Sequence, residues 1–178
     1  MGRFLNPDNT AFKEAINSKI YIDKSELINF TNQFINTQQK FICNSRPRRF
    51  GKSMAADMLL AYYNKNNDSK DIFSKLKIAK DPSFENHLNK YNVIYFDVQE
   101  CIDNAEKAEN VIEYITTNTI SEIKTVYGEI IPANIKTLSE SLSYINVATE
   151  NQFVIIIDEW DALFRAEPKK TILHEKYI

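Results

Sequence analysis

The chain has 178 residues, a length that suits one domain with a hydrophobic core rather than two domains. Its hydrophobic, aromatic and charged fractions are those of a globular protein, and a formal net charge of −2 excludes a global attraction to nucleic acid or to an anionic membrane. No window approaches the roughly 20 consecutive apolar residues of a membrane span, so no membrane partner is expected.

The first predicted elements are two helices, a strand and a third helix. A short helix fits residues 11–17, and an amphipathic helix opens at Asp23, where Glu26 completes a variant of the capping box. The apolar run FICNS at 41–45 predicts a short strand. From Lys52 to about Tyr63 the spacing of apolar residues predicts a further helix with one buried face.

The remaining sequence alternates strands with helices. The apolar run NVIYFDV predicts a second strand, and FVIIIDEWDALF begins with a third. The helices expected around them span about 71–76, 83–88, 105–127 and 135–145. Near-continuous apolar strands that alternate with helices predict an α/β fold, with a parallel sheet covered by helices on both faces.

The stretch SRPRRFGKS, between the first strand and its following helix, ends like a phosphate-binding loop. Gly51, Lys52 and Ser53 match the end of the pattern G-x-x-x-x-G-K-[ST]. The glycine lets backbone approach phosphate, the lysine contacts the outer phosphates, and the hydroxyl helps to hold magnesium. The residues expected around the nucleotide are Arg46, Pro47, Arg48, Arg49, Phe50, Gly51, Lys52 and Ser53.

Arg46 stands where the pattern has its first glycine. A glycine there would serve a turn with positive φ, which for arginine would cost about 1–2 kcal/mol. Pro47 favours an extended conformation for the residue before it and fixes its own φ at about −65°. A rigid, extended entry therefore replaces the flexible turn, and the substitution is compatible with a phosphate loop.

Two acidic residues follow the last predicted strand. Asp158 and Glu159 end the run FVIIIDE, and a magnesium–nucleotide site needs a carboxylate at the end of a strand near the loop. Asp158 suits the metal, together with Ser53, and Glu159 suits a base that orients or deprotonates water. Lys52 and Glu159 are the residues expected to carry catalysis.

The two cysteines and two histidines predict no metal or redox chemistry. Cys43 and Cys101 both stand beside apolar residues, which favours small buried thiols. The histidines His87 and His174 lie far apart without a cysteine pair nearby, so the spacing does not indicate a zinc site. This usage of cysteine predicts a reducing cytoplasm.

Four segments carry a resemblance to a known family: YIDKSELI, FICNSRPRRFGKSMAADML, LNKYNVIYFDVQ and FVIIIDEWDALF. In these segments the chain resembles the bacterial and archaeal AAA-ATPase-like proteins. Members of that family have an amino-terminal P-loop ATPase domain, often followed by a nuclease-like domain of the PD-(D/E)XK type. With the segments between, the resemblance covers nearly all of residues 1–178, and the form RPRRFGKS is its most specific part.

The resemblance implies a three-layer P-loop fold that binds and hydrolyses ATP with Mg²⁺. Gly51, Lys52 and Ser53 match the nucleotide loop of the family, and Asp158 and Glu159 match its metal-binding and water-activating acids. Family members continue into a sensor strand and further helices, whereas this sequence stops soon after DALFRAEP. We therefore expect the amino-terminal part of one such domain, incomplete at its carboxyl end, with self-association or a nuclease-like domain as partner.

Four further residues near these motifs have structural interpretations as well as functional ones. Asp97 closes the second predicted strand and suits a turn or a helix cap more than a site. Asp161 gives the tetrapeptide DEWD the look of a helicase box, but a cap or salt bridge fits better. Tyr21 suits the core more than an adenine contact, and Trp160 suits packing beside the acids.

Three hypotheses of function remain open from the sequence. The first is an ATP-binding module with Mg-dependent hydrolysis. The second is a non-catalytic interaction module that binds nucleotide or has lost it. The third is a nucleic-acid-handling fragment that uses Arg46, Arg48 and Arg49, which could instead contact phosphate, a neighbouring subunit or water.

Overall fold

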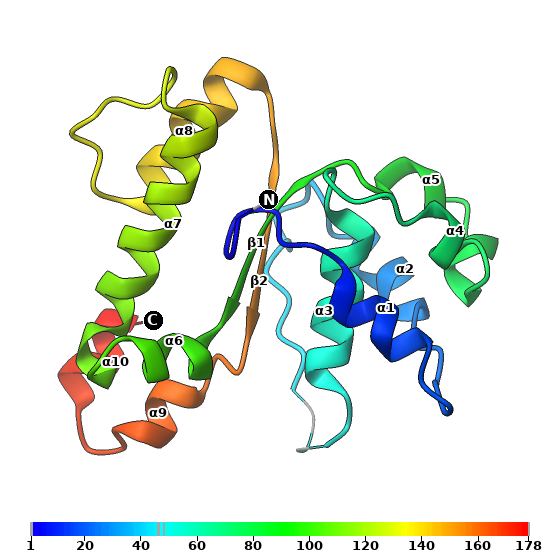
Figure 1. The fold of residues 1–178 in the computed structure, drawn as a ribbon, viewed down its shortest axis with the longest axis horizontal. Coiled ribbons are helices and arrows are strands. Elements are labelled where there is room, and N and C mark those ends of the chain that lie inside the picture. Colours follow the sequence, from blue (N-terminus) through cyan, green and yellow to red (C-terminus); the bar gives the residue numbers. More distant parts are fainter. Residues whose placement is uncertain (1, 46, 48, 178) are drawn as a thin grey trace. The chain divides into compact units, whose positions relative to one another are not determined.

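The computed structural model describes residues 2–45, 47 and 49–177 (Figure 1). The expectations for Arg46 and Arg48 lie outside the described residues. The chain divides into two compact units. We call Asn6–Val93 the amino-terminal unit, and Gly2–Leu5 with Ile94–Ile178 the carboxyl-terminal unit.

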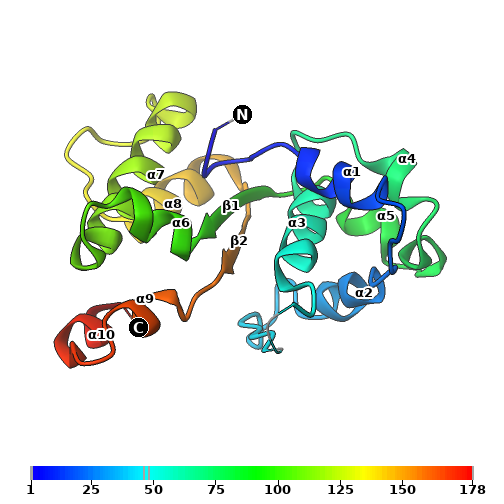
Figure 2. The ribbon, with the colours of Figure 1, turned by 60° about the horizontal axis from the view of Figure 1, so that its bottom comes forward.

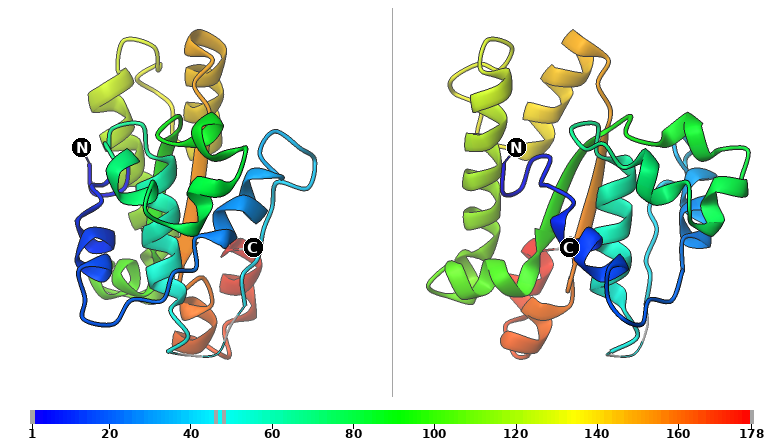
Figure 3. Two further views of the ribbon diagram at one scale, coloured as in Figure 1. Left: turned by 90° about the vertical axis from the view of Figure 1, so that its right-hand side faces the viewer. Right: turned by 45° about the vertical axis from the view of Figure 1, so that its right-hand side comes forward.

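The amino-terminal unit is built from short helices. Its elements are α1 (Thr10–Ile16), α2 (Glu26–Asn32), α3 (Lys52–Tyr63), α4 (Lys70–Phe73), the 3-10 helix η1 (Lys77–Lys80) and α5 (Phe84–His87). Helix α1 packs along α3, as Figure 3 shows, and α2, α4 and α5 contact η1. The helix from Lys52 to Tyr63 has the bounds that the sequence predicts.

Aromatic side chains fill the core of this unit. Phe73 is completely buried; its ring stacks on Phe12 at 5.2 Å and meets Tyr62 edge-on at 5.3 Å between ring centroids. Buried tyrosines need partners for their hydroxyl groups. Tyr62 donates to the carbonyl oxygen of Phe84, and Tyr63 donates to Asn32 Oδ1. These contacts hold the carboxyl-terminal end of α3 in the core.

The carboxyl-terminal unit combines a small parallel sheet with helices. Its elements are β1 (Asn92–Asp97, whose first two residues belong to the other unit), α6 (Val98–Asn104), the 3-10 helix η2 (Ala108–Asn110), α7 (Val111–Tyr127), α8 (Leu138–Thr149), β2 (Phe153–Asp158), α9 (Ala162–Ala166) and α10 (Thr171–Tyr177). Strands β1 and β2 pair with each other and run in the same direction. Helices α7 and α8 lie side by side in Figures 1 and 2.

One apolar core holds the carboxyl-terminal unit together. It joins Ile94 of β1 and Ile145 of α8 to Ile123 of α7 and Leu163 of α9, all less than 1% exposed. The extended segment at Leu5 also reaches this core and forms an antiparallel bridge to Ile94. Helix α9 follows the acid-bearing end of β2 and buries Leu163 in this core. The core packing therefore holds the end of β2 in place.

Four predictions from the sequence are wrong in the amino-terminal unit. The run 41–45 forms no strand, and all five residues are exposed, including Cys43, which was expected to be buried. A strand requires a paired neighbour, and apolar composition alone does not supply one. Helix α2 has Ser25 rather than Asp23 at its N-cap. The apolar spacing of 52–63 also places Met54 on the buried face of that helix, whereas the structure leaves it exposed.

Helix boundaries in the carboxyl-terminal unit differ from those predicted, and the exposure of β2 bears on its cover. The helix expected at 105–127 begins only at Val111, because the separate helix α6 precedes it and Glu106 adopts a left-handed φ of 60°. Ile155 and Ile157 of β2 are 46% and 51% exposed. One face of β2 is therefore partly exposed among the described residues, and the expected cover of helices on both faces stays a prediction.

The fold class is α/β, as the alternation of strands and helices predicts. Both described strands have the predicted positions, with β1 inside NVIYFDV and β2 at the start of FVIIIDEWDALF. Among the helices that the structure describes, none has the length and apolar character needed to cross a bilayer.

Candidate functional site

The loop before α3 has a left-handed conformation at two described residues. Gly51 has φ 75° and Arg49 has φ 67°. Glycine adopts this region without steric cost, whereas a side chain at position 51 would be strained. Pro47, Arg49 and Phe50 are all exposed. The glycine of the phosphate-loop pattern therefore stands at a position whose backbone conformation favours glycine.

Helix α3 begins without a side-chain cap. Gly51 is the N-cap residue, and among the described residues the helix has no side-chain cap hydrogen bond. Its carbonyl oxygen accepts the first helical bond, from the N–H of Ala55 at 3.1 Å. The preceding N–H groups of a helix have no intrahelical partner, and they carry the positive end of the helix dipole. Together with Lys52 and Ser53 they form an electropositive end of α3.

Lys24, a residue absent from the expected site, contacts this loop. Its Nζ donates a hydrogen bond of 2.8 Å to the carbonyl oxygen of Phe50. A Cβ added at Gly51 would lie 3.2 Å from the same nitrogen. Lys24 belongs to the segment YIDKSELI, so the motif was visible in the sequence, but spacing alone could not show where its lysine points.

The end of β2 places an unsatisfied carboxylate in a buried position. Asp158 is 6% exposed; its Oδ1 accepts a hydrogen bond of 2.9 Å from the N–H of Glu159, and its Oδ2 has no hydrogen-bond partner among the described residues. Buried carboxylate oxygens are normally paired with a donor or a metal. Asp158 therefore offers a free oxygen of the type that Mg²⁺ prefers.

Asp97 stands at the corresponding end of the neighbouring strand β1. Its side chain caps α6 by accepting a hydrogen bond of 3.0 Å from the N–H of Glu100, the capping role that the sequence favours. Burial raises the pKa of Asp97 above its usual value, and the negative charge of Asp158 raises it further, against the lowering effect of the cap. Two carboxylates thus share the carboxyl ends of two paired strands.

Glu159 follows Asp158 in a constrained turn. It has a left-handed φ of 50°, and its Oε2 accepts a hydrogen bond of 2.6 Å from Arg165 Nη2. The same guanidinium pairs with Asp161, in agreement with the salt-bridge interpretation of that residue. Trp160, between the two acids, is 47% exposed and meets Phe164 edge-on at 6.0 Å.

The expected site residues fall into two groups. Gly51, Lys52 and Ser53 lie together at the start of α3 in the amino-terminal unit, while Asp158 and Glu159 lie together at the end of β2 in the carboxyl-terminal unit. Within the described residues, no group of three or more histidine, cysteine, aspartate or glutamate side chains is arranged to hold a metal ion. Any magnesium site would therefore need oxygen atoms from a hydroxyl, from water or from the nucleotide.

A family model decides the membership of the chain. The model described as Predicted AAA-ATPase matches residues 10–177. The chain belongs to the Predicted AAA-ATPase family. Searches of curated proteins and of solved structures gave no match. The matched region includes both the phosphate loop and the acid-bearing strand, the segments in which the sequence resembles this family.

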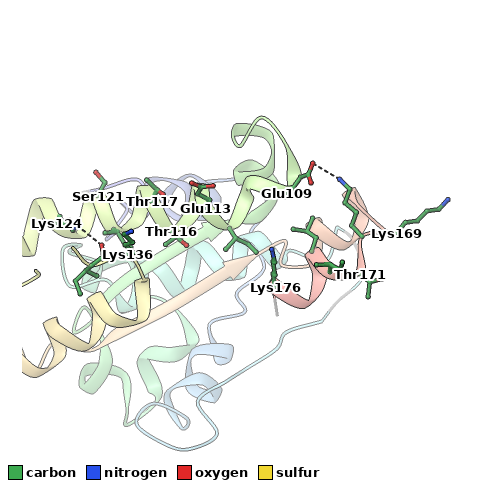
Figure 4. A pocket seen from close by; sticks show the side chains of 16 residues that line it. Glu109, Glu113, Thr116, Thr117, Ser121, Lys124, Lys136, Lys169, Thr171 and Lys176 are labelled. Carbon is green, nitrogen blue, oxygen red and sulfur yellow. Dashed lines mark hydrogen bonds and ion pairs between the residues drawn. The ribbon is translucent and has the colours of Figure 1, made fainter. Parts of the chain in front are cut away.

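A cavity of about 1190 Å³ lies in the carboxyl-terminal unit of this Predicted AAA-ATPase. Figure 4 shows its lining side chains, which come mainly from α7 and from residues 169–176. Its lining combines apolar side chains, among them Ile120, with five lysines: Lys124, Lys136, Lys169, Lys170 and Lys176. None of the expected site residues lines this cavity, so it is a feature separate from the phosphate loop and the acids.

Proposed function

We propose that this chain is the ATP-binding module of a P-loop ATPase with a three-layer P-loop fold. The observation that carries the proposal is Gly51, a left-handed residue that opens an uncapped helix directly before Lys52 and Ser53. Family membership supports a nucleotide as the ligand. Hydrolysis of ATP is the activity that follows from the acids at the end of β2.

Recognition of phosphate would use the first turn of α3. The unpaired N–H groups and the helix dipole favour an anion, and Lys52 adds a full positive charge beside them. Because Lys52 is half-buried while Ser53 is exposed, the lysine is partly held by its surroundings and the hydroxyl is open to a ligand. This division suits a lysine on the outer phosphates and a serine on a hydrated metal ion.

The assignment of Mg²⁺ to Ser53 and Asp158 is carried by the sequence motifs alone. In support, the buried Oδ2 of Asp158, which has no partner among the described residues, fits a magnesium ligand, direct or through water. When bound, the ion would neutralise charge on the phosphate oxygens.

Glu159 would orient the attacking water. Its carboxylate is partly exposed, so water can reach it, and the ion pair with Arg165 fixes its position. We place the module in the reducing cytoplasm, as the cysteine usage predicts.

Calorimetric titration of the purified chain with ATP and Mg²⁺ tests the proposal. We expect saturable binding that falls by at least about tenfold in Lys52→Ala, because a charged contact to phosphate is lost. Lys75→Ala, which changes an exposed lysine of the same unit, should bind like the unmodified chain. Absence of binding by the folded, unmodified chain would contradict the proposal.

Steady-state phosphate release separates the alternatives. Turnover that collapses in Glu159→Gln, with ATP affinity kept, supports an ATPase rather than a non-catalytic interaction module. A nucleic-acid-handling fragment would instead bind DNA without nucleotide, with an affinity that falls steeply as salt rises. Arg49→Ala tests that third hypothesis, since Arg49 is exposed in the described loop.

A further inference from the structure

The segment before α2 presents Lys24 to the phosphate loop. Asp23 fixes this segment from both sides: Oδ1 accepts the N–H of Ser25 and Oδ2 accepts the N–H of Lys77, each at 2.8 Å. Burial works to raise the pKa of Asp23, but these hydrogen bonds together lower it below its usual value, so the anchor is ionised at neutral pH. Ser25, fully buried, accepts the N–H of Ile78 through Oγ at 3.1 Å.

Lys24 stands between these two anchors and points the other way, to the loop. Its backbone is held in the turn before α2, where its carbonyl oxygen accepts the N–H of Leu27 at 3.0 Å. Its side chain is exposed, and its described hydrogen bond is the one to the carbonyl oxygen of Phe50. A lysine that only interacted with solvent would make no hydrogen bond to the carbonyl oxygen of Phe50, so this contact indicates a role for Lys24 in the loop.

The bond from Lys24 controls the direction of one N–H group. The carbonyl of Phe50 and the N–H of Gly51 belong to the same peptide unit, which is planar and trans, so they point in opposite directions. When Lys24 holds the oxygen, the N–H of Gly51 must face away from Lys24. The carbonyl oxygen of Phe50 lies close to the amino-terminal end of α3, and its partial negative charge would repel a phosphate bound there. The ammonium of Lys24 offsets that partial charge.

We propose that Lys24 is a positioning residue of the phosphate loop, and this inference rests on the proposed function. Its ammonium locks the Phe50–Gly51 peptide so that the N–H of Gly51 is directed at a bound phosphate. In the segment YIDKSELI, Asp23 and Ser25 fix the turn before α2 through their hydrogen bonds. This turn positions Lys24, and Lys24 restricts the conformation of the loop. Lys24 itself touches the protein backbone and not the nucleotide.

The chain contains three glycines, Gly2, Gly51 and Gly128, so a sample labelled with 15N-glycine gives one amide signal from the loop and two reference signals from the carboxyl-terminal unit. In Lys24→Met, without nucleotide, we expect the Gly51 signal to shift and its heteronuclear NOE to fall, while the two references stay unchanged. Lys24→Arg, which keeps a charged donor, should retain the order of Gly51. Lys19→Met, at another exposed lysine of the same unit, is the matched control.

Titration with ATP and Mg²⁺ on the same variants gives the second readout. We expect Lys24→Met to weaken binding by about tenfold, as for loss of one charge-assisted hydrogen bond, and Lys24→Arg to recover most of the affinity. Thermal unfolding without nucleotide should be the same for all four proteins, because Lys24 is exposed.

The two readouts fail independently. An unmoved, equally ordered Gly51 signal in Lys24→Met overturns the inference, whether or not ATP binds. If affinity falls while Gly51 stays unmoved, Lys24 contacts phosphate directly, and the positioning role is wrong. If the unmodified chain binds no ATP, the proposed function fails, and the glycine signal still decides whether Lys24 orders the loop.

Discussion

The loop before α3 and the strand end at Asp158 rest on different physical supports. The loop is exposed, and its conformation depends on its backbone: Gly51 is left-handed, and Lys24 donates a hydrogen bond to the carbonyl oxygen of Phe50. The strand end depends on core packing: Asp158 is buried, and Leu163 of the following helix α9 is completely buried in the hydrophobic core. Changes in the loop should therefore alter ligand binding with little effect on stability, while changes near the strand end should alter stability first.

Gly51→Val should give the largest effect and break the loop alone. A β-branched residue at φ 75° is strained by about 1–2 kcal/mol, and its Cβ would lie 3.2 Å from Lys24 Nζ. We expect ATP binding to be lost, measured by calorimetry, while the chain stays folded. Gly51→Asn is the matched control, because asparagine tolerates this backbone region better; equal loss in both would contradict the role of φ.

Leu163→Ala should break the support of the strand end. This side chain is completely buried in the carboxyl-terminal core, so its truncation should lower the free energy of unfolding by about 2–5 kcal/mol. Urea denaturation measures the loss. Ile172→Ala, at a residue 74% exposed, should change stability by less than about 0.5 kcal/mol. Similar losses in the two variants would show that Leu163 does not carry the core.

Asp97→Asn should sharpen the comparison through pH. The folded state raises the pKa of Asp97, so its ionised form weakens the fold at neutral pH, and this cost disappears as pH falls through the raised value. Asparagine keeps the cap and removes the charge, so the variant should be more stable at pH 7, by no more than about 1 kcal/mol because the group is partly exposed. Thermal unfolding across pH should show the advantage shrinking in acid; a constant difference would contradict it.

Arg165→Met should give the smallest effect. The guanidinium pairs with Glu159 and Asp161, and all three side chains are about one-third exposed. Such pairs contribute about 0–1 kcal/mol and are screened by salt. We expect a slight loss of thermal stability in dilute buffer that vanishes at high salt. A loss that persists at high salt would mean that Arg165 packs rather than pairs.

Local patterns predicted much of the fold correctly. The apolar spacing from Lys52 gave the bounds of α3, and the continuous runs at β1 and β2 gave both described strands. What failed depends on partners that are distant in sequence: the run 41–45 is apolar but forms no described strand. The sequence did not predict α6, although Asp97 and Glu100 form a capping pattern, because the helix begins directly after the apolar strand with no turn residue between them.

For the candidate site, the sequence identified residue types better than their surroundings. The sequence predicted a glycine for close approach of backbone to phosphate at position 51, but it did not predict the left-handed φ of 75° that the structure shows there. Spacing could not predict that Lys24 reaches Phe50, because 26 residues separate them and the contact depends on how α2 docks on η1. Likewise, the unsatisfied oxygen of Asp158 is a result of packing, not of composition.

The single tryptophan of the chain gives the strand end an optical signature of its own. Trp160 lies between Glu159 and Asp161 and is about half exposed, while the tyrosines of the amino-terminal core absorb at shorter wavelengths. Excitation at a wavelength that only tryptophan absorbs therefore gives emission from Trp160, beside the acids after β2, and none from the phosphate loop. We therefore expect the emission of Trp160, which needs no attached label, to respond when an ion or nucleotide binds beside these carboxylates.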